Sequence, residues 1–121
     1  MDKLAELVDL VKKCRDNCPW CKEQTFESYL QQVLSEAVEL EEAVESGNKE
    51  FISEEMGDLL WDVVMLLHLG EHKGLFDKNL VIDAVNKKIL RRKPYLESGE
   101  QVTIEEAMRI WKEEKAKEKK K

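Results

Sequence analysis

Apolar residues recur every three or four positions along most of the chain, which is the spacing of amphipathic helices. The first run predicts a helix over about residues 2–16, with apolar positions at Leu4, Leu7, Val8, Leu10 and Val11. Pro19 cannot continue a helix and also restricts Cys18. We therefore expect the segment 17–20 to break this helix, and a loop that carries Trp20 to follow through about Gln24.

Capping signals delimit a long helical hairpin in the middle of the chain. Thr25 is expected to cap a second helix, which should run to Ser46 and stop at the Gly47-Asn48 pair. A third helix is expected over about 49–72, before Gly74. Since so few residues join these two helices, they should pack as an antiparallel hairpin.

The C-terminal third has its own start and stop signals. Asp77 is expected to cap a fourth helix that reaches about Arg92, because Pro94 stops it. Residues 94–102 are expected to form a loop. The sequence at 103–106 is a capping box that opens a last helix, which fades into a charged, solvated tail.

These elements predict an all-α fold, an antiparallel bundle of about five helices. No strand pattern or internal repeat interrupts it. A chain of 121 residues has the size of one domain, and we expect a helical domain over 1–111 with a charged tail over 112–121 that continues the last helix. A sheetless chain this short often completes its bundle by oligomerisation, so a homodimer or homotetramer is expected.

Composition supports this fold and narrows the partners. Charged residues make up 38% and apolar ones 42%, with only 5 Gly and 2 Pro. The net charge of −6 argues against nucleic acid or an anionic membrane as the main partner. No apolar run reaches membrane-spanning length, and the N-terminus lacks a signal-peptide core. We therefore expect a cytoplasmic protein.

The third helix carries acids in an apolar setting. Glu55, Asp58 and Asp62 fall within an arc of about 60° at 100° per residue. The same arc holds Met65, Leu66 and Leu69. A helix that is apolar almost all round must be buried, inside its domain or between subunits. Carboxylates in such surroundings would take up a proton or require a cation.

The second helix supplies a facing pair. Glu36 and Glu39 lie one turn apart, beside an apolar stripe made by Leu30, Val33, Ala37 and Val44. Folding the hairpin would bring this pair against Glu55 and Asp58, and four carboxylates suit Mg²⁺ or Mn²⁺. Pairs at this spacing more commonly face solvent, which we expect for Glu41, Glu42 and Glu45.

A basic cluster ends the fourth helix. The sequence from Asn86 to Lys93 carries five cationic residues in an acidic protein. Cations at a helix C-terminus are ordinary dipole partners. Beside a metal site they would also suit a phosphate chain. Trp20 is open to two interpretations, a core residue or a surface on which a base stacks.

The cysteines and histidines admit further metal chemistries. Cys14, Cys18 and Cys21 have the C-x3-C-x2-C spacing seen around some iron–sulfur clusters, but no strands are present to build the barrel such chemistry needs. Zinc would require a fourth ligand. We expect reduced thiols, with a Cys18–Cys21 or Cys14–Cys18 disulfide as the next interpretation. A di-iron site at His68 and His72 is disfavoured, since both lie several turns from Glu55.

Six short motifs occur in a specific order along nearly the whole chain, from about residue 14 to 119. They are CPWCKEQT at 18–25, SEAVE at 35–39, EMGDLL at 55–60, GLFD at 74–77, RRKP at 91–94 and WKEEK at 111–115. Together they resemble the MazG-type nucleotide pyrophosphohydrolases, part of the all-α nucleoside triphosphate pyrophosphatase group, in the form with a single domain.

This resemblance implies hydrolysis of nucleoside triphosphates, NTP or dNTP, to the monophosphate and pyrophosphate. It implies that Glu36, Glu39, Glu55 and Asp58 form the catalytic Mg²⁺ site. It also implies substrate contacts from two further segments. These are Trp20, Lys22 and Gln24 on the nucleotide side, and Asn86, Lys88, Arg91 and Arg92 at the phosphates.

Several positions depart from the family pattern. Ser35 replaces the first Glu of the usual E-E-x-x-E, and a hydroxyl cannot accept a proton near neutral pH as a carboxylate does. Asp62 is our candidate accessory acid, and Glu54 is a weaker one. Cys21 stands where the family has Asp, and Lys93 where it has His.

Two alternative functions follow from these departures and from the shared fold. The chain could bind nucleotide or metal as a regulatory protein without turnover. It could also be a phosphoribosyl-ATP pyrophosphohydrolase, although the CPW segment favours the MazG type. Base and sugar preference, the choice between dimer and tetramer, and the biological role have no signature in the sequence.

Overall fold

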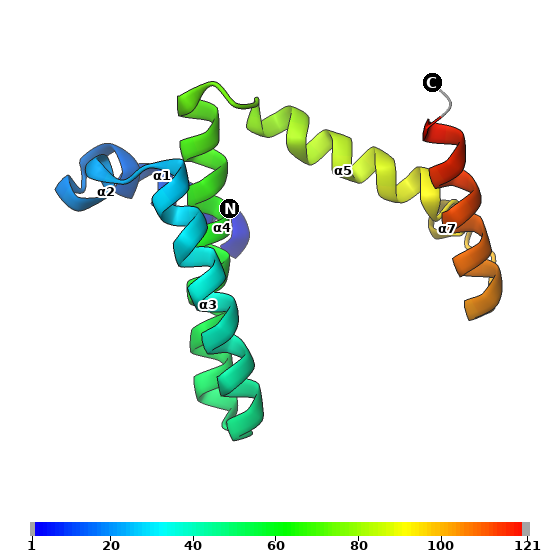
Figure 1. Ribbon diagram of the computed structural model, residues 1–121, viewed down its shortest axis with the longest axis horizontal. Helices are drawn as coiled ribbons and strands as arrows, with labels where there is room; N and C mark the ends of the chain where they lie inside the picture. The colour runs from blue at the N-terminus through cyan, green and yellow to red at the C-terminus, as the bar shows by residue number, and fades with distance from the viewer. Residues whose placement is uncertain (1, 120–121) are drawn as a thin grey trace. The chain divides into compact units, whose positions relative to one another are not determined.

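The computed structural model describes residues 2–119 (Figure 1). All regular elements in that range are helices and none is a strand, so the all-α prediction is confirmed. The chain divides into two compact units, Met1–Lys78 and Asn79–Lys121, which are described in turn.

The first unit holds four helices whose ends follow local chemistry. They are α1 (Lys3–Asn17), α2 (Pro19–Glu23), α3 (Phe26–Ser46) and α4 (Lys49–Lys73). Thr25 caps α3 as predicted, because its hydroxyl accepts from Ser28 N while the Ser28 hydroxyl accepts from Thr25 N, both at 3.0 Å. Gly47 ends α3 with a left-handed φ of 71°, which costs glycine little. Asn48 then caps α4.

The predicted loop before α3 is wrong in one respect, since it contains the short helix α2. Pro19 ends α1 as expected, but it also occupies the first turn of α2. Proline suits that position because its missing N–H would have no helical partner there and its φ is already helical. The same residue therefore stops one helix and starts the next.

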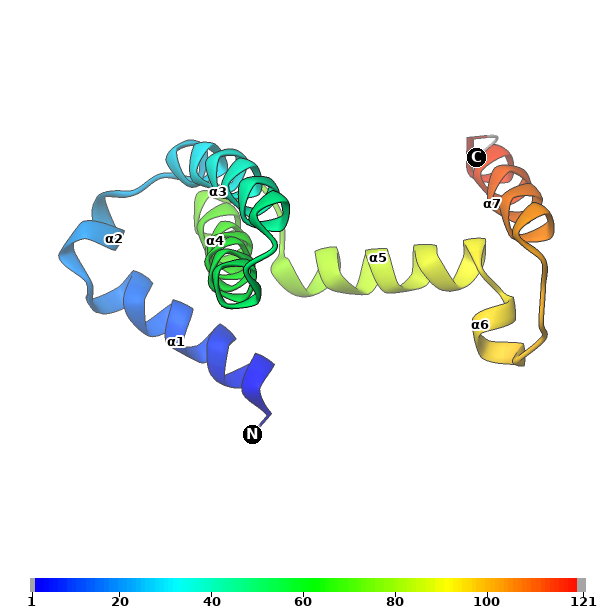
Figure 2. The same ribbon diagram turned by 90° about the horizontal axis from the view of Figure 1, so that it is seen from below.

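Helices α3 and α4 form the predicted antiparallel hairpin (Figure 1). Helix α1 packs on another face of α4, and α2 packs on α1 (Figure 2). The hairpin is closed by Gly47 and Asn48 alone. Residues one to three turns from this connection on the two helices therefore face one another.

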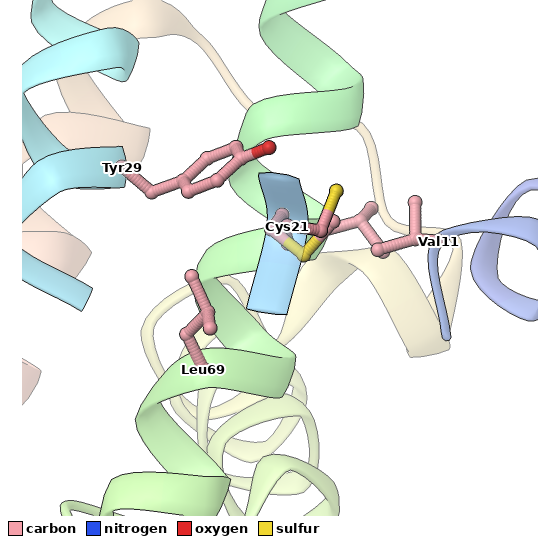
Figure 3. Packing of buried hydrophobic residues seen from close by; sticks show 6 residues of the cluster. Val11, Cys21, Tyr29 and Leu69 are labelled. Carbon is pink, nitrogen blue, oxygen red and sulfur yellow. The ribbon is translucent and has the colours of Figure 1, made fainter. Parts of the chain in front are cut away.

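The core lies where α1, α2, the start of α3 and the second half of α4 meet. Figure 3 shows the Tyr29 ring reaching toward Cys21, with Val11 on the far side. The buried cluster consists of Val11, Cys21, Tyr29, Val64, Met65 and Leu69. Met65 and Val11 have no exposed surface, but Val63 is 41% exposed, so the expected burial of this helix is only partial in the single chain.

The apolar stripe predicted on the second helix is largely uncovered in the single chain. Leu30 is 40% and Val44 58% exposed on α3, and Met56 on α4 is 47% exposed. The reason is that α3 packs chiefly on α4, so each helix of the hairpin has one apolar side without a neighbour in the unit. The buried residues of α4 all lie between Asp62 and Gly70.

The second unit contains most of α5 (Lys78–Arg92), then α6 (Tyr95–Ser98) and α7 (Ile104–Lys119) (Figure 2). The predicted loop over 94–102 is wrong where α6 interrupts it; Pro94 precedes this turn and Gly99 ends it with a φ of 76°. Thr103 caps α7 as predicted, accepting from Glu106 N at 3.1 Å.

Within residues 2–119, the helices are all too short or too polar to cross a membrane.

Candidate functional site

The acidic site is built by the hairpin. Glu36 lies on α3 ten residues before its last residue, and Glu55 lies six residues into α4. Because Gly47 and Asn48 reverse the chain, these two levels come together, and Glu39 extends the α3 side by one turn. One oxygen from each of Glu36, Glu39 and Glu55 lies within 4.8 Å of the others.

Two oxygens in this group have no partner. Glu36 Oε2 and Glu55 Oε2 are buried, yet neither accepts a hydrogen bond from any residue between 2 and 119. A buried carboxylate oxygen without a donor is unfavourable, because it has lost water and gained nothing in exchange. Three neighbouring carboxylates, two of which carry a buried unpaired oxygen, form a donor set that fits a hard divalent cation such as Mg²⁺.

The electrostatics reflect the same crowding. Burial, followed by the neighbouring carboxyls of Glu39, Glu55 and Asp58, raises the pKa of Glu36 to about 7. The pKa of Glu55 is also raised, chiefly by burial. Without a cation, the site therefore favours a retained proton over three full negative charges.

The two aspartates of the predicted arc take different positions. Asp58 is exposed and lies outside the group of oxygens within 4.8 Å, although its charge raises the pKa of Glu36. Asp62 is only 8% exposed, and burial followed by the charge of Asp58 raises its pKa to about 6. Asp62 is thus a buried acid next to the acidic cluster along α4, where an apolar residue would be ordinary.

The predicted nucleotide-side residues lie on and just after α2. Trp20 is 53% exposed and meets Tyr29 edge-on, with ring centroids 6.0 Å apart, so it is not a buried core residue. Lys22 is exposed. The Gln24 side chain donates to Trp20 O at 3.3 Å and accepts from the Ser28 hydroxyl at 3.0 Å, so it holds the turn between α2 and α3.

The predicted phosphate contacts lie in the second unit and are partly engaged there. Asn86 and Lys88 are exposed on α5. Arg91 Nε donates to Glu118 Oε2 at 2.9 Å, and Arg92 Nη2 donates to Glu118 Oε1 at 2.9 Å. The buried Arg92 guanidinium also lies 4.7 Å from the centroid of the Trp111 ring.

Sequence reasoning missed the importance of Glu118. The charged tail was expected to be solvated, but the two arginines hold the pKa of Glu118 down to about 2. Helical spacing offers a signal: Trp111, Glu114 and Glu118 fall at i, i+3 and i+7, on one face of α7. The candidate metal groups among the described residues are a group of three cysteines and a group of three carboxylates.

The described residues thus form an all-α protein whose α3–α4 hairpin carries a cluster of three carboxylates, a candidate cation site. Residues 24–97 match the family of the MazG nucleotide pyrophosphohydrolase domain, and the chain belongs to that family. The family resemblance is thereby confirmed.

Named relatives cover most of this chain but are longer than it. A nucleoside triphosphate pyrophosphohydrolase of Mycolicibacterium smegmatis is 36% identical over 98% of this chain and 37% of its own length. The corresponding protein of Escherichia coli K12 is 32% identical over 79% of this chain and 38% of its own. The chain thus spans little more than a third of these relatives.

A solved structure supports the fold. The crystal structure of a mazG-related protein from Thermotoga maritima aligns with a TM-score of 0.88 at 32% identity. The alignment covers 93% of this chain and 98% of that chain. The all-α arrangement is therefore that of a MazG-related protein over almost its full length.

Proposed function

We propose that this protein hydrolyses nucleoside triphosphates, NTP or dNTP, to the monophosphate and pyrophosphate in the presence of Mg²⁺, with Mn²⁺ as a substitute. Membership of the MazG family supports the reaction. The observation that carries the proposal is the triad of Glu36, Glu39 and Glu55, in which one buried oxygen of Glu36 and one of Glu55 lack any donor among the residues described.

The carboxylates have distinct tasks in this proposal. Glu36, Glu39 and Glu55 would hold Mg²⁺, and Asp58 would complete the set from the exposed side of the cluster. When bound, the ion would neutralise phosphate charge and polarise the phosphorus under attack. On binding the cation, the carboxyl groups of this cluster would release their retained proton to solvent.

Asp62 is the proposed proton acceptor for the attacking water. Its buried position gives it a pKa of about 6, so at pH 7 to 8 it is mostly ionised and yet basic enough to accept a proton. Ser35, which stands at the family's Glu position, is exposed and has no carboxylate to offer. Asp62 would therefore supply the function that Ser35 cannot.

Two sets of side chains are proposed as substrate contacts. The exposed face of Trp20 would stack on the base, with Lys22 beside it and Gln24 keeping the α2–α3 turn in place. Lys88 and Asn86 would contact the phosphates directly. Arg91 and Arg92 would do so in competition with Glu118, since that carboxylate already engages both guanidinium groups.

We also propose that the protein is a homodimer or homotetramer in the cytoplasm, where nucleotides are at hand. Exposed leucine, valine and methionine side chains on α3 and α4 support assembly. The net charge of −6 supports a small-molecule substrate over nucleic acid or membrane.

The test is a panel of canonical and modified NTPs and dNTPs with Mg²⁺, with pyrophosphate and orthophosphate detected separately. Pyrophosphate with monophosphate is expected for at least one substrate, and Glu55→Gln should reduce the rate by about 100-fold or more. Glu42→Gln, an exposed acid on α3, is the matched control and should leave the rate unchanged. Orthophosphate release, or equal rates in Glu55→Gln, would contradict the proposal.

A second candidate is a nucleotide- or metal-binding regulatory protein, which the Ser35 position favours. In that case nucleotide with Mg²⁺ would bind with measurable heat in calorimetry, and no substrate of the panel would yield product. Turnover that Asp62→Asn abolishes, with Mg²⁺ affinity unchanged, would exclude this second function and support Asp62 as the proton acceptor.

A further inference from the structure

Three thiols converge at the junction of α1 and α2. Cys14 lies in the last turn of α1, Cys18 joins the two helices, and Cys21 lies within α2. Their sulfur atoms lie within 4.8 Å of one another, and Cys14 Sγ is 2.7 Å from Cys21 Sγ. None of the three takes part in the proposed hydrolysis.

The apolar surroundings of the three cysteines favour an uncharged disulfide over a charged metal–thiolate site. Cys21 is 3% exposed and belongs to the apolar core, between Val11 and Tyr29 (Figure 3). Three thiolates on a divalent ion would carry a net negative charge into that core, whereas a disulfide is uncharged. A zinc site would also need a fourth ligand, and among the described residues the group contains these three alone.

The distances point to one pair. Sulfur atoms on a shared zinc ion are about 3.8 Å apart, from Zn–S bonds of about 2.3 Å and tetrahedral angles. A disulfide bond is about 2.05 Å long. The Cys14–Cys21 separation of 2.7 Å is far shorter than the first and closer to the second. These two sulfurs need only a small approach to bond.

The third thiol has the properties of the group that reacts first. Cys18 is half-buried, so a small reagent can reach it. The backbone N–H of Cys21 stabilises its thiolate and lowers the pKa of Cys18, while burial raises the pKa of Cys21 to about 12. Thiolate character and access govern thiol reactivity, so Cys18 should attack before Cys21.

We propose that Cys14 and Cys21 form a reversible disulfide by exchange with a low-molecular-mass disulfide, with Cys18 as the first thiol to react. This proposal does not rest on the hydrolytic function. Its stable product would tie the end of α1 to α2, the helix that carries Trp20 and Lys22.

The exchange balances in three displacements. Cys18 thiolate attacks RS–SR, forming Cys18–SR and releasing RS⁻, which takes up a proton. Cys14 then displaces the second RSH from Cys18, and Cys21 displaces Cys18 from Cys14, so that Cys18 returns to a thiol. The two protons from Cys14 and Cys21 end on two RSH molecules, and the external disulfide is the oxidant that is reduced.

The test uses the full chain, purified with reductant and then exposed to oxidised glutathione. Trypsin cuts after Lys13, Arg15 and Lys22, so Cys14 and Cys21 fall on separate peptides, 14–15 and 16–22. The expected product has lost two hydrogens without gaining glutathione. Non-reducing digestion should join the two peptides, and iodoacetamide should modify Cys18 alone.

Single variants separate the roles. Cys14→Ser should abolish the joined peptides. Cys18→Ser should give the same joined peptides about tenfold more slowly, because Cys14 must then react without the more reactive thiol. An unchanged rate in Cys18→Ser would overturn the order of reaction.

Four other outcomes would overturn the proposal. Three alkylatable thiols after oxidation would do so, as would a lasting glutathione adduct on Cys18. A Cys18–Cys21 disulfide, which stays within peptide 16–22, would show that the wrong pair was chosen. A transition metal retained by the freshly isolated chain in native mass spectrometry would show a metal site in its place.

Discussion

At the scale of single residues, the most consequential feature is an acid without a partner. Glu36 is partly buried, its Oε2 accepts no hydrogen bond within residues 2–119, and two further carboxylates lie near it. Burial raises its pKa to about 7, so the metal-free protein is destabilised as the pH rises from about 4.5 through 7. A cation would reverse this penalty. The same side chain therefore opposes folding and supports binding.

We predict that Glu36→Gln raises the melting temperature of the EDTA-treated protein at pH 8 by about 2–5 °C, because the repulsion disappears. The difference should vanish below pH 4.5, where both the folded and the unfolded chain are protonated at this position. Added Mg²⁺ should raise the melting temperature of the wild type and not that of Glu36→Gln. In scanning calorimetry, the control Glu42→Gln should have the melting temperatures of the wild type. A melting temperature of EDTA-treated Glu36→Gln below that of the wild type would contradict the prediction.

At the scale of elements, α4 contains two glycines in opposite surroundings. The Phe76 ring packs directly over Gly70, so an added Cβ would collide with it. Phe76 is also held edge-on by Phe26, with centroids 6.3 Å apart, so it cannot move away freely. Gly57 has no atom within 4 Å of the place where a Cβ would be.

We predict that Gly70→Ala destabilises the fold by about 1–2 kcal/mol through overpacking, in spite of alanine's better helix propensity. Gly57→Ala should stabilise it by about 0.5–1 kcal/mol, because only propensity changes there. Urea unfolding of the two variants measures the change in the free energy of unfolding, and its sign, for each substitution. Phe76→Leu should relieve the defect of Gly70→Ala; stability losses that add in the double variant would argue against the contact.

The Glu118 carboxylate on α7 pairs with two arginines at the end of α5. Arg92 first, and then Arg91, lower the pKa of Glu118 to about 2. For an acid with a lowered pKa, the stabilisation is complete above its unfolded value near 4.5 and is lost as the pH falls toward 2.

We therefore predict that the Trp111 indole N–H resonance keeps its shift from pH 7 to about 5 and moves as the pH falls from 4.5 to 2. Loss of the Glu118 charge frees Arg92, which lies over that ring. Glu118→Gln should show the displaced resonance already at pH 7, without this acid transition. An identical titration in the variant would mean that another group controls the contact.

At the scale of the whole molecule, the uncovered apolar side chains of the hairpin predict self-association. Leu34 and Val38 on α3 are 56% and 54% exposed, and Met56 on α4 is 47% exposed. Light scattering should give twice or four times the chain mass of 14.2 kDa. Leu34→Glu should lower that mass, whereas Leu96→Glu, an equally exposed leucine on α6, should not. A monomer in the wild type would contradict the proposed assembly.

The sequence predicts the long helices well and the short ones poorly. Thr25, Gly47 and Asn48 set the ends of α3 and α4 by local hydrogen bonds and backbone freedom, which a sequence displays directly. The sequence pattern does not predict helix α2, because Pro19 reads as a helix breaker there, although proline also favours a first turn. A five-residue helix has too few positions for a periodic pattern.

Spacing along the two hairpin helices predicts that the glutamates of the acidic site come together. It does not predict the ion pairs that the arginines of α5 form with Glu118. Glu36 and Glu39 share a helix face with i, i+3 spacing, and a two-residue connection brings Glu55 opposite. The bonds from Arg92 to Glu118 join residues 26 positions apart, which no local period reveals. Burial of Asp62 likewise depends on tertiary packing around α4, which no local period reveals.

The two-residue connection between α3 and α4 also bears on the order of folding. Contacts between residues close in sequence form quickly, because little chain entropy is lost in closing a short loop. The hairpin is such an element, so it should form early and bring Glu36, Glu39 and Glu55 together before α1 and α2 dock. The acidic repulsion is then felt in the folding transition state, and dissolved divalent cations would speed folding itself as well as stabilise its product.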